Sequence, residues 1–326
     1  MPIEPLLTPT LSASASEKLD WLEFSVFLSP NGVARLDVLV AALDQQEEAQ
    51  IEDIGEEDRY KEAVVEEIEN EFNFRSESLD ESYPFLLSDD AEELHLARSW
   101  DDHRAVFYYV CLLASHLKRS PFLGFNVDEV TISTLRNDVF QIVSTLAMAG
   151  VAMGPSVSIG WPRRNGESII ETLKRASASY AGFTPRETPH PEIANPADKD
   201  GGMDVISWRN TTRPPPLNLY FGQVASGHDW KDKSAKNKAS SFISKFLDIG
   251  PLGNTDYTTL TPMRIFDEPL WKRENSDHGS VVDRTILPSL AYSGLELSQA
   301  GIMIDEADRL HEVVQWVVAY RTEALA

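Results

Sequence analysis

An aspartate, a glutamine and two lysines occur in an order that suits the hydrolysis of phosphate esters. Asp204 follows a glycine-rich turn and precedes the apolar run VISW, and Gln223 lies near the end of the alternating stretch LNLYFGQ. Lys231 and Lys233 come a few residues later. Carboxylate and amide oxygens on neighbouring strands can bind a hard cation such as Mg²⁺. A nearby ammonium group can stabilise the negative charge that develops on a phosphate, so the pattern indicates a metal-dependent phosphodiesterase.

The strings DGGMDVISW and GQVASG resemble the core of the PD-(D/E)xK nucleases, and the resemblance extends over about residues 166–266. In that family one strand carries an aspartate, which Asp204 matches. The next strand carries Asp, Glu or Gln two residues before a lysine, and Gln223 matches the first of these positions. A glutamate on the preceding helix often joins the metal site, and Glu171 and Glu167 are the matching residues.

The resemblance implies a mixed α/β fold with the restriction-endonuclease-like αβββαβ core, and Mg²⁺ or Mn²⁺ as the cofactor. Many relatives cut DNA in restriction, repair or anti-phage defence. The expected role is therefore a DNA nuclease, the effector subunit of a prokaryotic defence system that works with a partner such as a helicase or ATPase.

The chain departs from the family pattern where the catalytic lysine is expected, because Ala225 stands two residues after Gln223. A unit charge about 4 Å from a phosphate contributes roughly 4 kcal/mol at an effective dielectric constant near 20, or about a thousandfold in rate. In some branches of the family the lysine has moved to the following helix, which we expect from about Asp229, its potential cap, to Asp248. Lys231 and Lys233 would lie in its first turn, about 200° apart, so only one can face the site, and we favour Lys233.

An inactive nucleic-acid-binding subunit remains the alternative reading of Ala225, and a pure protein-interaction subunit is a third. Lys236, Lys238 and Lys245 follow on the same expected helix and could contact the phosphate backbone without reading its sequence. Trp208 and Trp230 are expected in the core rather than as surfaces on which bases stack.

A second motif, IMIDEADRL at Ile302–Leu310, spells the DEAD box of helicases. An ATPase also needs a phosphate-binding loop that ends in Gly-Lys, and none of the 17 glycines is followed by lysine. The acidic residues are better explained as the beginning of a helix from Asp305 to Glu323, where they complement the helix dipole.

Hydrophobic periodicity predicts the elements that must position these residues. The spacing of Tyr60, Val64, Ile68 and Phe72 predicts an amphipathic helix in the acidic segment, while DWLEFSVFLS could be a strand or the start of a helix. Further helices are expected near residues 102–117, 132–153 and 166–180, and strands at DGGMDVISW, LNLYFGQ and YTTLTPMRIF.

Charge divides the chain unevenly. Residues 1–150 contain 10 Lys and Arg against 30 Asp and Glu, whereas residues 163–245 contain 13 basic and 9 acidic side chains. We therefore expect an acidic, mainly helical domain over residues 1–159 and a nuclease domain over residues 160–326. The acidic domain could bind a protein partner such as the helicase or ATPase, or lie across the site as a polyanion mimic.

The remaining composition excludes several classes of site. A single cysteine, Cys111, rules out an intrachain disulfide and a cysteine-cluster metal site. The apolar runs are shorter than the roughly 20 residues that cross a bilayer, so no membrane association is expected. The first residues lack the pattern of a secretory signal, which favours a cytoplasmic location.

Overall fold

The computed structural model describes residues 6–47, 54–120, 122–123, 127–161, 163, 166–195 and 198–325, with the side chains of residues 47 and 54–60 left out. The chain forms two compact units. Unit 1 comprises Met1–Ile132 and Val314–Ala326, and unit 2 comprises Ser133–Val313. The boundary between the units lies at residue 133 rather than at residue 160. The strand at residues 156–158 is an edge strand of the sheet of unit 2, and the helix at residues 140–152 belongs to the same unit.

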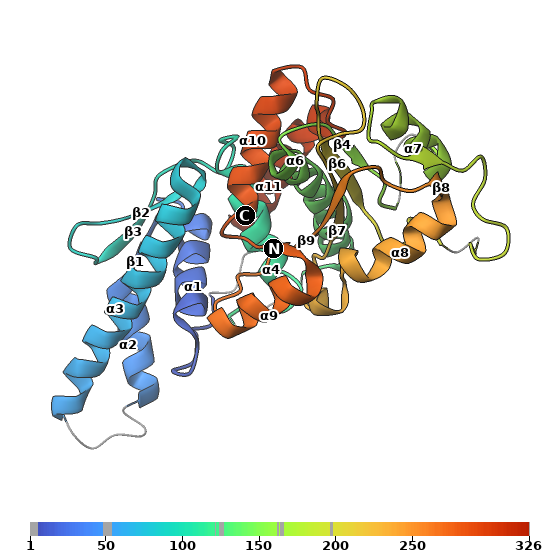
Figure 1. The fold of residues 1–326 in the computed structure, drawn as a ribbon. Helices are drawn as coiled ribbons and strands as arrows, with labels where there is room; N and C mark the ends of the chain where they lie inside the picture. Colours follow the sequence, from blue (N-terminus) through green and yellow to red (C-terminus); the bar gives the residue numbers. More distant parts are fainter. Residues whose placement is uncertain are drawn as a thin grey trace. The chain divides into compact units, whose positions relative to one another are not determined.

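Unit 1 is mainly helical, as predicted, with a small sheet that the sequence analysis missed (Figure 1). The segment DWLEFSVFLS is part of a helix, whose first turn is closed by a capping box between Ser14 and Glu17. The three-stranded sheet is antiparallel in the order β1-β3-β2. The elements are α1 (Ala15–Leu28), β1 (Val33–Arg35), α2 (Leu36–Glu47), α3 (Ile54–Leu79), η1 (Asp80–Ser82), β2 (Phe85–Leu87), β3 (Glu93–Leu96) and α4 (Val106–His116).

The predicted apolar face of α3 is confirmed where its side chains are described, since Val64, Ile68 and Phe72 are buried; the side chain of Tyr60 lies outside the described set. The same helix buries Arg75 completely. Its guanidinium donates to Glu71 on α3 at 2.8 Å, and to two carboxylates of α1 at 2.7 and 2.9 Å, those of Asp20 and Glu23.

Unit 2 is built on a five-stranded mixed sheet in the order β10-β9-β7-β6-β4. Strand β6 is antiparallel to both of its neighbours, whereas β7, β9 and β10 run parallel to one another. Three of these strands lie in segments predicted as strands, although β9 ends at Leu260, well before the end of its predicted run. The strands are β4 (Ser156–Ser158), β6 (Val205–Arg209), β7 (Asn218–Val224), β9 (Asn254–Leu260) and β10 (Ser280–Val282).

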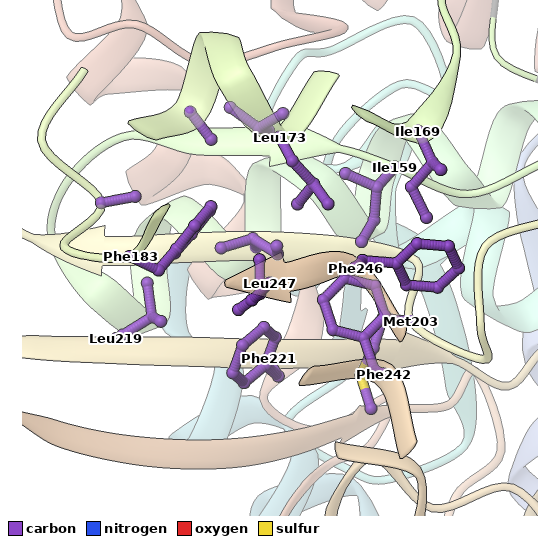
Figure 2. Packing of buried hydrophobic residues seen from close by; sticks show 14 of the residues in the cluster. Ile159, Ile169, Leu173, Phe183, Met203, Leu219, Phe221, Phe242, Phe246 and Leu247 are labelled. Carbon is purple, nitrogen blue, oxygen red and sulfur yellow. The ribbon is translucent and has the colours of Figure 1, made fainter. Parts of the chain in front are cut away.

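One face of this sheet packs against α7 (Ile169–Ala178) and α8 (Ala235–Phe246) through the core shown in Figure 2. Phe221 of β7 lies edge-on to Phe242 of α8, and Leu173 of α7 is fully buried. Strands β5 (Thr184–Pro185) and β8 (Leu247–Ile249) form a two-stranded ladder at the side of this core. The buried apolar side chains of both helices therefore belong to this core.

The helix predicted near residues 132–153 is confirmed, and a π-helical turn at Leu135–Val139 lies between its α-helical parts, α5 (Glu129–Thr134) and α6 (Phe140–Ala152). Helix α6 contacts β4, β6 and β7, and on its other side packs against α10 (Leu287–Gln299). A Cβ at Gly150 of α6 would lie 2.2 Å from the Leu290 carbonyl oxygen, and one at Gly294 of α10 would lie 2.0 Å from that of Leu146. Only glycine allows this approach of the two backbones.

The remaining elements of the chain follow β9. Helix α9 (Glu268–His278) contacts β10 and α8, and a short turn, η4 (Ala307–Arg309), leads into α11 (Leu310–Leu325), which crosses from unit 2 into unit 1. None of the helices over the described residues has the length and apolar character needed to cross a membrane.

Candidate functional site

Asp204 and Gln223 lie side by side where the inner strands β6 and β7 meet one end of the sheet. Val205 pairs with Gly222, so the residue that precedes β6 falls beside the one that follows Gly222 on β7. The backbone N–H of Asp204 donates to the Gly222 carbonyl at 2.9 Å. The N–H of Val224 donates to Asp204 Oδ2 at 2.7 Å. The alternation along the two strands places both side chains on the face that carries α8.

The amide of Gln223 is buried, with 8% of the residue exposed, and its Oε1 has no hydrogen-bond partner among the described residues. Thr259 of β9 is the register partner of Gln223, is fully buried, and leaves Oγ1 equally unpartnered within that part of the chain. Buried polar atoms without a partner are uncommon, because each costs free energy. Asp204, Gln223 and Thr259 thus form a polar row across three neighbouring strands.

Burial raises the pKa of Asp204 to about 7, although the hydrogen bond from the Val224 N–H opposes the shift. The charge of Asp200 raises this pKa further and the ammonium of Lys233 lowers it. Asp204 is therefore a perturbed carboxyl with a cation near it, which is the combination found at many functional sites.

The two lysines occupy different settings, and neither lies in the first turn of α8. Lys231 belongs to a short turn, η3 (Trp230–Asp232), and Lys233 lies between this turn and α8, which is capped by Ser234 rather than Asp229. The Lys231 ammonium lies 5.9 Å from the centre of the Trp230 ring. Lys233 is half-buried, lies 3.8 Å from Asp229, and acts electrostatically on Asp204.

Gln141 of α6 supports the aspartate from the other face of the sheet. Its Nε2 donates to Ser158 Oγ at 3.2 Å and to the Asp204 carbonyl at 3.3 Å. Gly160 is next to both groups, because a Cβ at this position would lie 3.1 Å from Asp204 Oδ1 and 3.2 Å from Gln141 Nε2. Gln141 could not be found from the sequence, since a glutamine at the start of an apolar helix gives no functional signal by itself.

The two predicted glutamate ligands have other partners. Glu171 completes a capping box at the beginning of α7, and hydrogen bonds from Ser168 lower its pKa. Glu167 forms an ion pair with Arg175 at 3.2 Å and accepts a hydrogen bond from Thr172. Within the described ranges no group of three or more acidic, histidine or cysteine residues is placed to hold a metal, so neither glutamate gathers with Asp204 into such a group.

Ala225, at the position where the resemblance implies a lysine, is fully buried against Trp230, Ile265 and Val281. A lysine at this position would have to carry its charge into an apolar cluster, so the fold disfavours it. Trp230 is only 4% exposed and Trp208 is fully buried, which confirms the expectation that both are core residues.

The three lysines assigned to phosphate contacts are not equally available. Lys245 forms an ion pair with Asp198 at 2.8 Å, and Lys236 donates to the Ser276 carbonyl at 2.9 Å. The stem of Lys238 lies against the turn that precedes Asp204, because a Cβ at Gly202 would lie 3.1 Å from its Cγ. Lys238 is therefore the one that belongs to the surroundings of Asp204.

The acidic residues of the DEAD-like string line a separate pocket of about 370 Å³. Asp305 forms an ion pair with Arg175 at 2.7 Å and accepts the Ser158 N–H, while Glu306 pairs with Arg309. These carboxylates are held by arginines, and the charges of the pocket are largely neutralised by one another.

Two oxygen donors of the polar row fit a hard divalent cation. The buried, unpartnered Gln223 Oε1 and the Asp204 carboxylate stand on adjacent strands. Mg²⁺ is usually held by one or two carboxylates and by the phosphates of its substrate, so this sparse set is sufficient for it. The fit depends on a substrate that completes the site.

No protein-family model, curated protein or solved structure matches the chain. The candidate site is therefore defined by its own geometry, which is the polar row of Asp204, Gln223 and Thr259 with the ammonium of Lys233 acting on it.

Proposed function

We propose that unit 2 is a metal-dependent nuclease that hydrolyses phosphodiester bonds, with DNA as the expected substrate. The observation that carries the proposal is the pairing of Asp204 with Gln223, whose buried Oε1 lacks a partner in the described structure, beside the ammonium of Lys233. An active site can keep such an unsatisfied buried oxygen because a ligand satisfies it.

Each residue has a distinct part in this proposal. Asp204 and Gln223 would hold Mg²⁺ or Mn²⁺, which when bound polarises a phosphate oxygen and activates water. Lys233 stabilises the negative charge that accumulates on the phosphate. The Val224 N–H fixes one oxygen of the Asp204 carboxylate, and Gln141 fixes the backbone on which Asp204 stands.

The topology of unit 2 supports the same proposal. Helix α6, strands β4, β6 and β7, helix α8 and strand β9 follow one another in the order expected for the αβββαβ core, with α7 and β5 inserted after β4 and β8 inserted after α8. Asp204 then immediately precedes the second strand and Gln223 lies on the third, as the resemblance implies. The inserted elements are departures from that order.

The decisive test compares Asp204→Asn with the unaltered protein, because asparagine can still accept the Val224 N–H. We expect the variant to keep its fold, seen by circular dichroism, and to lose metal-dependent cleavage of single-stranded and duplex DNA by about a thousandfold or more. Cleavage by Asp204→Asn at the original rate would overturn the proposal.

The lysine assignment has its own matched pair. Lys233→Met is expected to slow cleavage by roughly a hundredfold to a thousandfold, since the lost charge contributes up to about 4 kcal/mol. Lys231→Met is expected to retain cleavage within about a factor of three. If the two variants lost single-turnover cleavage rate equally, neither lysine alone would be the residue that stabilises the phosphate charge.

We further propose that unit 1 binds a protein partner, such as the helicase or ATPase of a defence system. Helix α3 exposes Glu62, Glu66 and Glu67 along one side, and the first 150 residues are strongly acidic. Charge reversal at Glu62 and Glu66 is expected to abolish a salt-sensitive association with such a partner while leaving intrinsic cleavage unchanged. Association that resists this change and high salt would exclude α3 as the docking surface.

A further inference from the structure

Trp161 is exposed close to the Asp204 carboxylate. It follows Gly160, at which a Cβ would lie 3.1 Å from Asp204 Oδ1. Because consecutive Cα atoms are 3.8 Å apart, the Trp161 Cα lies within about 8.5 Å of that oxygen. Its side chain is 52% exposed, whereas Trp208 and Trp230 are core residues.

Two cations accompany this ring. The guanidinium carbon of Arg163 lies 5.4 Å from the centre of the Trp161 ring, and the ammonium of Lys199 lies 5.3 Å from it. Both contacts are within the range of cation–π attraction, which orients the ring and leaves positive charge at its edge.

Arg163 makes the arrangement rigid. It donates to the carbonyl oxygens of Ile159 at 2.7 Å, Glu167 at 3.0 Å and Lys199 at 3.0 Å. These bonds join the segment that carries Trp161 to the loop that leads into Asp204. The ring, its cations and the carboxylate are therefore held on one frame.

The charges around the ring suit a polyanion. Lys199 forms no ion pair with a carboxylate of the described residues. Arg163 donates to neutral carbonyls, and the carboxylates of Asp200 and Glu167 also act electrostatically on it. The stem of Lys238 lies against Gly202 in the same loop. An aromatic surface with basic neighbours is the arrangement by which proteins bind unpaired bases, since every base has a face that can stack while its phosphates meet the cations.

We propose that Trp161 is a stacking surface for one unpaired nucleobase of the substrate, so that the site acts on single-stranded or frayed nucleic acid. The inference rests on the proposed nuclease function, because the stacked nucleotide is the one whose neighbouring phosphate reaches Asp204. Duplex DNA, whose bases stack on one another, cannot offer such a base without local opening.

The test measures binding without cleavage, by fluorescence anisotropy of labelled oligothymidine, oligouridine and a matched duplex in the presence of a chelator. Trp161→Ala is expected to weaken single-strand binding roughly 5- to 150-fold, the loss of one stacked base, with duplex binding unchanged. Trp161→Phe is expected to recover most of the affinity. Tyr180→Ala is the control, because Tyr180 is 61% exposed beside Asn210, at the opposite end of β6.

Each outcome decides between the two proposals. Single-strand affinity that is the same in Trp161→Ala and the unaltered protein, or a preference of the unaltered protein for duplex, overturns the stacking role; the ring is then left for a protein partner. If Trp161→Ala loses single-strand binding but the unaltered protein never cleaves with Mg²⁺ or Mn²⁺, the stacking role stands and the nuclease fails.

Discussion

At the scale of single residues, the site is defined by buried polar groups that the fold leaves unsatisfied. Gln223 and Thr259 each keep an unpartnered oxygen at the level of Asp204, within the described structure. Such groups lower stability, and these two lie on the same face of the sheet as the Asp204 side chain.

Thr259 and Thr258 provide a matched comparison. Both are fully buried with an unpartnered Oγ1, but they lie on opposite faces of β9. Replacing either by valine is expected to raise the free energy of unfolding by about 1 kcal/mol, because an unsatisfied hydroxyl is removed. Only Thr259→Val is expected to reduce cleavage, by about tenfold. Equal activities of the two variants in single-turnover assays would remove Thr259 from the site.

Asp204 predicts a pH dependence of stability. Its pKa is about 7 in the folded protein, against an ordinary aspartate value of 3.8, so the folded state holds the proton more tightly. Its contribution to stability is complete below about pH 4, is lost as the pH rises towards 7, and is constant above that. Asp204→Asn is therefore expected to become more stable than the unaltered protein as the pH rises, by up to about 4 kcal/mol.

Urea unfolding at pH 5 and pH 8 in the presence of a chelator measures this difference. Asp277→Asn, at an exposed position of α9, is the control variant. A stability difference for Asp204→Asn that is equal at the two pH values would contradict the raised pKa.

At the scale of elements, the position of the site depends on the close packing of α6 and α10. Gly150 and Gly294 each face a carbonyl oxygen of the other helix, so the two backbones are in direct contact. Helix α6 begins one residue before Gln141, which donates to the Asp204 carbonyl. The rear layer of unit 2 thereby fixes the strand end that carries the aspartate.

Gly294→Ala is expected to destabilise unit 2 by about 2 kcal/mol or more, although alanine is the better helix former, because the new methyl would press on the Leu146 carbonyl. Ser293→Ala in the same helix is the control and is expected to change stability by less than about 0.5 kcal/mol. Chemical unfolding followed by circular dichroism would show the difference. A stabilised Gly294→Ala would mean that the helices can separate freely.

The sequence predicted the elements whose periodicity is complete. The alternation of LNLYFGQ and the apolar spacing of residues 166–180 were sufficient for β7 and α7, because burial of one face governs both patterns. The strands of unit 1, which have three or four residues each, were missed, since so few residues cannot display alternation. The start of α8 was misplaced because Ser234, not Asp229, supplies the oxygen that caps it.

Only those residues of the candidate site that lie in locally recognisable strands could be predicted from the sequence. Asp204 and Gln223 follow from strands that are close in sequence and pair as neighbours. Thr259 could not be found in this way, because a parallel partner strand is chosen by the tertiary fold. Glu171 was assigned to the metal from its place on a helix, but Ser168 offers it a capping box three residues away.

At the scale of the whole molecule, unit 1 contains a buried ionic network that joins three helices. Arg75 of α3 binds Asp20 and Glu23 of α1, and Tyr108 of α4 donates to Glu23 at 2.7 Å. Burial alone would lower the pKa of Arg75, but the surrounding negative groups raise it well above its usual value. The guanidinium is therefore a permanent cation at the centre of unit 1.

Arg75→Ala is expected to lower the free energy of unfolding of unit 1 by about 3–5 kcal/mol, because it removes the cation that three buried carboxylates share. Arg35→Ala, which breaks an exposed ion pair with Asp37, is the control and is expected to leave the urea midpoint unchanged. A small effect of Arg75→Ala would contradict a stabilising role of the network.

Unit 1 is made from both ends of the described chain, and this has a consequence for the order of events during synthesis. Arg321 donates to the carbonyl oxygens of Phe27 and Ser29 at 2.7 and 2.9 Å and lies over the Trp100 ring. The ribosome makes these partners nearly 300 residues before it makes Arg321. The first 132 residues therefore cannot complete unit 1 until α11 has been made.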